Sequence, residues 1–109
     1  MSETVFSSNN GPDIKSPTDE QLRERLAQLD LDRDGEAFAS LQRNPMTYVQ
    51  VDGDAAHGFR LEYQEGDTRH HYVAAREDFT LDEIVAAMRE YRDDVIVWEK
   101  YGPWERLRL

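Results

Sequence analysis

The chain contains no cysteine among its 109 residues. This absence excludes disulfide bonds, thiolate metal sites and cysteine nucleophiles. No apolar run approaches the ~20 residues that a helix needs to cross a bilayer. The opening stretch, MSETVFSSNNGPDIKSP, has neither the basic nor the apolar segment of a signal peptide, so we expect a cytoplasmic location.

Basic residues are scarce: 13 Lys and Arg stand against 23 Asp and Glu, for a formal net charge of −10. Acids outnumber bases in both halves of the chain. This charge repels nucleic acid and anionic membranes, and it favours solubility or a basic protein partner. Hydrophobic residues make up 39% of the chain, which is enough for one two-layer core.

The beginning of the chain lacks apolar periodicity. Residues 1–15 are rich in Ser, Asn, Gly and Pro, so we expect a mobile arm followed by a single domain over residues 16–109. A helix is expected to begin at Ser16 as N-cap, with Pro17 as its first helical residue and Asp19 as capping-box partner. Leucines then recur at helical spacing: Leu22, Leu26 and Leu29.

After the first helix the apolar period changes to two. Residues 46–51, 58–64 and 69–75 alternate and predict a three-stranded antiparallel meander. Residues 36–42 fit a further strand or a helix equally well, and residues 95–99 predict a short strand.

A second helix has the clearest signals. Thr80 is the expected N-cap and Glu83 its capping-box partner, with Phe79 and Ile84 placed for a hydrophobic staple. One apolar stripe follows: Leu81, Ile84, Val85, Met88 and Tyr91. The predicted fold class is therefore α+β, with an N-terminal helix, an antiparallel sheet of three to five strands and a second helix packed on one face.

The stretch DLDRDGEAFASL begins like a calcium-binding loop. Its acidic positions are Asp30, Asp32, Asp34 and Glu36. Position 12 of such a loop supplies a bidentate glutamate, but here it is Leu41. We therefore reject calcium binding and expect the polar end of a helix, with Gly35 as the left-handed residue that stops it.

The three histidines, His57, His70 and His71, do not form a metal motif. Neighbouring strand residues such as His70 and His71 point to opposite faces, and a zinc site built from Asp52, Asp54 and His57 lacks the usual ligand spacing. We expect no metal and no cofactor. No nucleophile motif and no phosphate-binding glycine loop occur, so the chain is not expected to be an enzyme.

Aromatic and acidic side chains offer a protein-binding surface. Tyr101 and Trp104 lie near a basic, apolar C-terminal segment, which either forms an exposed binding surface or docks back on its own sheet. Carboxylates would steer a basic partner and aromatics would anchor it. The candidate partner-binding residues are Glu62, Asp82, Glu83, Tyr101 and Trp104.

About half of the chain carries a series of short sequence motifs. They are GFRLEY at 58–63, a His-Tyr pair at 71–72, a capped Leu-Asp-Glu helix that ends near Tyr91, and the late tryptophans Trp98 and Trp104. This pattern resembles a group of small bacterial proteins of unknown function, a resemblance that implies no activity. In size and acidity the chain also resembles immunity proteins of bacterial toxin systems.

These observations favour a cytoplasmic acidic module, immunity-protein-like, that binds or inhibits a basic protein partner by occlusion. The alternative is a small adaptor or regulatory domain whose acidity serves only solubility. Weak calcium or other metal binding and enzyme activity rank below both.

Overall fold

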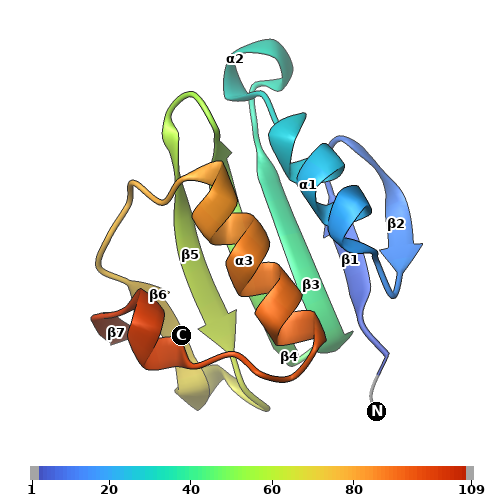
Figure 1. The fold of residues 1–109 in the computed structure, drawn as a ribbon. Coiled ribbons are helices and arrows are strands. Elements are labelled where there is room, and N and C mark those ends of the chain that lie inside the picture. The colour runs from blue at the N-terminus through green and yellow to red at the C-terminus, as the bar shows by residue number, and fades with distance from the viewer. Residues whose placement is uncertain (1–2, 108–109) are drawn as a thin grey trace.

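A seven-stranded antiparallel sheet dominates residues 3–107, the part of the chain that the computed structural model describes (Figure 1). The strand order is β2-β1-β3-β4-β5-β6-β7. The strands are β1 (Val5–Ser8), β2 (Gly11–Lys15), β3 (Phe38–Asn44), β4 (Thr47–Asp54), β5 (Gly58–Gln64), β6 (His71–Ala74) and β7 (Trp104–Leu107). The helices are α1 (Asp19–Ala27), α2 (Leu31–Asp34) and α3 (Leu81–Arg92), with 3-10 turns η1 (Thr68–His70) and η2 (Trp98–Tyr101).

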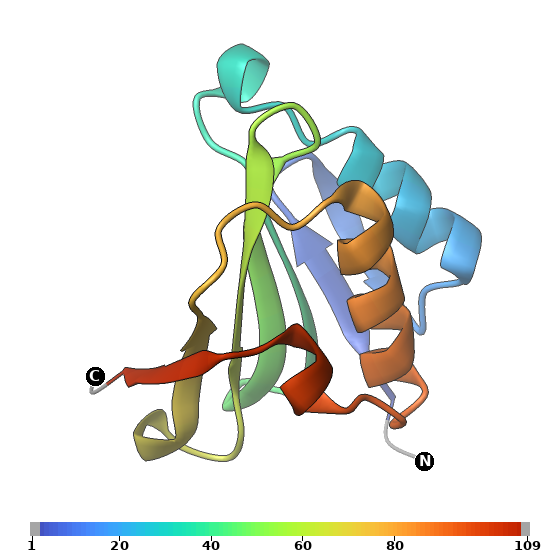
Figure 2. The ribbon, with the colours of Figure 1, turned by 60° about the vertical axis from the view of Figure 1, so that its left-hand side comes forward.

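The two longer helices form a second layer on one face of this sheet. α1 and α3 lie side by side, and in Figure 2 both stand on the same side of the strands. The core fills the space between the layers, where Phe59, Leu61 and Val51 are fully buried. In the described residues, no helix combines the length and the apolar character that crossing a membrane requires.

The predicted sheet of three to five strands was wrong, although the α+β class holds. The main omission is the N-terminal hairpin, because Val5–Lys15 was expected to be an arm outside the sheet. Instead β1 pairs with both β2 and β3, and Phe6 enters the core with no exposed surface. Residues 36–42, left open between strand and helix, contribute to strand β3.

Helix α1 begins later than predicted. Thr18, and not Ser16, is the N-cap, and its capping-box partner is Gln21 in place of Asp19. Ser16 takes a positive φ of 47° and so turns the chain from β2 into the helix. The capping box of α3 is confirmed, since Thr80 and Glu83 exchange the two expected hydrogen bonds.

The C-terminal segment runs across the lower end of the molecule in Figure 1 before it joins the sheet. Residues 95–99 were predicted to be a strand, and this was wrong: the chain runs irregularly into η2. Trp98 stacks on Tyr63 with ring centroids 3.7 Å apart and planes 4° from parallel. β7 then pairs with β6 at one edge of the sheet.

Candidate functional site

A hollow of about 480 Å³ lies where α2 meets β3 and β4. In Figure 1, α2 stands at the upper end of the sheet. We call this cavity the Leu31–Phe38 hollow, because these two apolar side chains line it while remaining 38% and 43% exposed. Other lining residues are Glu36, Gln50, Asp52 and Gly53. Partly exposed apolar side chains next to carboxylates give this site the chemistry of a small protein-binding surface.

The acidic stretch before the hollow forms a helix of its own. Asp30 is the N-cap of α2, and its carboxylate accepts from the Arg33 backbone N–H at 2.9 Å. Gly35 ends α2 with φ 75°, the left-handed conformation predicted for it. The predicted tail of the first helix is therefore a separate turn, since α1 ends at Ala27.

The carboxylates weighed for calcium serve local structure or point to solvent. Asp34 accepts two hydrogen bonds from the Arg33 side chain, at 2.9 Å each. Asp32 has an 82% exposed side chain. Residues 3–107 contain no group of three or more His, Cys, Asp or Glu placed to hold a metal ion.

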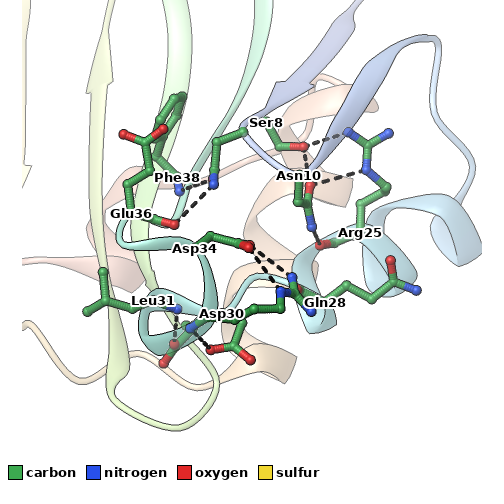
Figure 3. A network of polar contacts seen from close by, with 12 residues as sticks. Ser8, Asn10, Arg25, Gln28, Asp30, Leu31, Asp34, Glu36 and Phe38 are labelled. Carbon is green, nitrogen blue, oxygen red and sulfur yellow. Dashed lines mark hydrogen bonds and ion pairs between the residues drawn. The ribbon is translucent and has the colours of Figure 1, made fainter.

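The N-terminal hairpin braces one wall of the hollow (Figure 3). The Asn9 side chain donates to the Glu36 carbonyl at 3.0 Å and accepts from the Phe38 N–H at 2.9 Å. Arg25 of α1 donates to Ser8 Oγ at 2.6 Å and so ties the same hairpin to the helix layer. The segment that carries Glu36 and Phe38 is thus held by a hairpin 27 to 29 residues earlier in the chain, and α1 in turn braces that hairpin.

Asp54 fixes the other side of the hollow. Its buried carboxylate accepts from the Leu31 N–H at 2.8 Å, the His57 N–H at 2.8 Å and His57 Nδ1 at 2.7 Å. These bonds join the first turn of α2 to the turn between β4 and β5. Leu31 is therefore positioned by a residue 23 places further along the chain.

The charges of Asp54 and His57 support each other. Burial acts to raise the pKa of Asp54, but the hydrogen bonds from Leu31 and His57 outweigh it, so this pKa lies below its usual value. The hydrogen bond to Asp54 and its charge raise the pKa of His57, with Asp32 adding to the effect. Asp32 lies 3.8 Å from His57 Nε2. Of the zinc ligands considered from the sequence, Asp54 and His57 therefore form an ion pair within one turn, and Asp52 takes no part in it.

Asp52 belongs to the hollow instead. It pairs with Phe38 across β3 and β4, and its carboxylate lies 3.2 Å from Arg60 Nε. Burial raises the pKa of Asp52, while the charge of Arg60 opposes this shift. A cationic side chain entering the hollow would meet both this carboxylate and that of Glu36.

The structure does not bring the five predicted partner-binding residues to one surface. Glu62 lies on the helix-free face of the sheet and accepts from Gln50 and His71. Asp82 and Glu83 stand in the first turn of α3, in the other layer.

Both carboxylates form ion pairs with arginines, as Asp52 does with Arg60. Asp82 forms a 2.8 Å ion pair with Arg23. Glu83 takes hydrogen bonds from Arg76 and from the Thr80 N–H, which lower its pKa to about 2.

The two aromatic candidates pack inward. Tyr101 is 5% exposed and donates to Glu90 at 2.8 Å; burial and this bond raise its pKa to about 12. Trp104 is half-buried, and its Nε1 donates to the Trp98 carbonyl at 2.7 Å. Of the two placements considered for the C-terminal segment, docking on its own sheet is the one the structure has.

The residues missed from the sequence are the apolar ones of the hollow. Leu31 and Phe38 lie within the stretch DLDRDGEAFASL, which the sequence analysis considered only for its carboxylates. Their exposure depends on where β4 passes, which no local pattern indicates.

Comparisons of the chain with protein-family models, with curated proteins and with solved structures return no match. The resemblance to small bacterial proteins and to immunity proteins therefore stays a prediction.

Proposed function

We propose that this chain is a protein-binding module that docks a basic partner on the Leu31–Phe38 hollow. The observation that carries the proposal is the pairing of two exposed apolar side chains, Leu31 and Phe38, with the carboxylates of Glu36 and Asp52 in one hollow. Protein interfaces place apolar anchors at the centre and polar groups at the rim. An arginine or lysine of the partner would lay its apolar stem on Phe38 and its charge beside the carboxylates.

The charge around the hollow supports a basic partner. Within residues 3–107 Glu36 takes part in no ion pair, and Asp32, whose side chain is 82% exposed, has only a 3.8 Å contact with His57. With a net charge of −10, the whole chain attracts cations over a distance set by the ionic strength. Such a field raises the association rate with a basic protein more than it raises affinity.

The bracing of the hollow supports binding without rearrangement. Hydrogen bonds from Asn9 and to Asp54 hold the segments on either side of it before any partner arrives. A surface that is already ordered loses less conformational entropy on association. This rigidity suits a module that acts by covering a basic site on its partner.

Occlusion of that kind is the inhibitor form of the proposal, and it matches the immunity-like function predicted from the sequence. The adaptor alternative assigns the acidity to solubility alone. The two differ in one property: only an electrostatically steered partner associates more slowly as salt is added. A cytoplasmic location stays a prediction.

The test begins by capturing partners from lysate of the source organism at low and high salt. The partner that is captured is then purified and titrated calorimetrically against three forms of the chain. These are wild type, the double variant Leu31→Ala/Phe38→Ala, and the control Val95→Ala/Val97→Ala, whose two valines are exposed outside the hollow. We expect the first variant to bind about 30-fold more weakly than wild type and the control to bind as wild type does.

Two results would overturn the proposal. One is equal affinity of both double variants for the partner, which would place docking elsewhere. The other is an association rate that stays constant as salt is raised, which would favour the adaptor alternative.

A further inference from the structure

The polar side chains that line the Leu31–Phe38 hollow are mainly acceptors of hydrogen bonds. Two of them are the carboxylates of Glu36 and Asp52. The third belongs to Gln50, which already donates through Nε2 to Glu62 and so has its amide oxygen left for a ligand. Among residues 3–107 no Lys, Arg or His lines this hollow. Its chemistry therefore suits a cationic group that carries several donors.

Phe38 adds an aromatic ring beside these acceptors. It pairs with Asp52 across β3 and β4, so both side chains leave the same face of the sheet. A flat cation can lie on this ring and reach the carboxylate at the same time. The guanidinium of arginine is planar, weakly hydrated and carries several N–H donors, whereas the ammonium of lysine is a compact and strongly hydrated charge. The arrangement therefore favours arginine.

The chain itself places one guanidinium at this carboxylate. Arg60 of β5 is the cross-strand neighbour of Asp52, and its Nε lies 3.2 Å from Asp52 Oδ1. The two side chains are 54% and 42% exposed, so water reaches the ion pair. Exposed pairs of this kind contribute little to stability. Another guanidinium can therefore replace Arg60 at Asp52 without disturbing the fold.

We propose that the Leu31–Phe38 hollow selects an arginine of the partner over a lysine, and that this arginine replaces Arg60 at Asp52. The incoming guanidinium lies on Phe38, and the oxygens of Glu36 and Gln50 accept from its remaining N–H groups. Arg60 is then a competitor that lowers the affinity for the partner. This inference rests on the proposed function and names the side chain that the docking site recognises.

The test is an NMR titration of the ¹⁵N-labelled full chain with two peptides of equal charge. One is N-acetyl-leucyl-arginyl-leucinamide, and the other has lysine in place of arginine; their leucines can contact Leu31. We expect saturable shifts of the Gly35, Phe38 and Gly53 amides, which border the hollow. The arginine peptide should bind at least about fivefold more tightly than the lysine peptide.

Two charge-matched pairs of variants locate the selectivity. The ion pair of Asp82 with Arg23 lies in the helix layer and serves as the control for that of Asp52 with Arg60. Asp52→Asn should abolish the preference for the arginine peptide, and Asp82→Asn should keep it. Arg60→Ala should bind the arginine peptide about threefold more tightly than Arg23→Ala does, because only the first removes the competitor. A gain of affinity does not arise from damage to the fold.

Three outcomes would overturn the proposal. They are equal affinity for the two peptides, no shift with either peptide at about 10 mM, and equal affinity of Arg60→Ala and Arg23→Ala for the arginine peptide. Failure of the proposed function looks different, because it is seen with the captured partner: that partner would bind Leu31→Ala/Phe38→Ala as tightly as wild type. A partner that docks on the hollow while both peptides bind equally would refute only the selection of arginine.

Discussion

Asp54→Ala and Asp67→Ala should differ strongly in stability, although each aspartate accepts from a nearby backbone N–H and from Nδ1 of the histidine three residues on. Asp54 accepts from the backbone N–H and from Nδ1 of His57, at 2.8 and 2.7 Å. Asp67 accepts from the Arg69 N–H at 2.9 Å and from His70 Nδ1 at 2.8 Å. The two differ in two respects: the side chain of Asp54 is 4% exposed and that of Asp67 is 41% exposed, and only Asp54 also accepts from a distant backbone N–H, that of Leu31.

The magnitude follows from what each substitution leaves behind. Removal of the Asp54 carboxylate deprives the backbone N–H groups of both Leu31 and His57 of their acceptor. A buried donor left without a partner costs roughly 1–3 kcal/mol. Allowing for some access of water, we expect Asp54→Ala to lower the free energy of unfolding by about 3 kcal/mol. Water replaces the exposed Asp67 carboxylate, so Asp67→Ala should be hard to distinguish from wild type.

The assay is urea unfolding at pH 7, followed by tryptophan fluorescence, with both variants and wild type measured together. Asp54→Asn is a useful third form. The asparagine side chain keeps one acceptor oxygen, but its NH₂ group faces an N–H that Asp54 had accepted from. The free energy of unfolding should therefore fall by about 2 kcal/mol. Equal losses for Asp54→Ala and Asp67→Ala would refute the reasoning, since neither the burial of Asp54 nor its bond from Leu31 would then contribute to stability.

Three further predictions use other local features. The pKa of His57 is raised, so its ion pair stabilises the fold fully below the ordinary pKa of about 6.5, and this stabilisation is lost as pH rises through the pKa of the folded protein. In an NMR titration, the midpoint of His57 in the wild type should lie above its midpoint in the Asp54→Asn variant. Equal midpoints would contradict this. Thr80→Ala should cost about 1 kcal/mol by removing the N-cap of α3, and unchanged thermal unfolding would count against it. Gly53→Ala, whose Cβ would stand 2.2 Å from the Gly58 carbonyl oxygen at φ 100°, should destabilise by more than about 2 kcal/mol. Gly66→Ala has open space and should cost only about 1 kcal/mol, so equal values in urea unfolding would be inconsistent with the clash.

The elements that the sequence predicted well depend on local signals. The capping box at Thr80 and the apolar stripe after it are complete within one helix, so α3 needed no tertiary information. The alternation over residues 58–64 likewise matches β5 in full.

The elements that were missed depend on distant partners. β1 holds a single fully buried side chain, Phe6, and becomes a strand because β3 pairs with it. Residues 95–97 are apolar without being a strand: Asp94 takes φ 59° and turns the chain across the core, and Val95 and Val97 stay exposed. Apolar residues there predicted pairing, but the stacking of Trp98 decides the path.

The candidate site shows the same division. The turn at Gly35 was predictable from its own residues, but the meeting of Phe38 with Asp52 requires the register of β3 on β4. The bracing by Asn9 requires the N-terminal hairpin that sequence analysis placed outside the sheet. Partner-binding residues chosen by type alone therefore fell on separate surfaces.

The most direct test of the account is the footprint of the captured partner on the ¹⁵N-labelled chain, read from amide shifts in the complex. The account predicts that the largest shifts cluster over residues 35–38 and at Asp52 and Gly53, which border the Leu31–Phe38 hollow. A footprint confined to Asp82 and Glu83, in the first turn of α3 in the other layer, would contradict it.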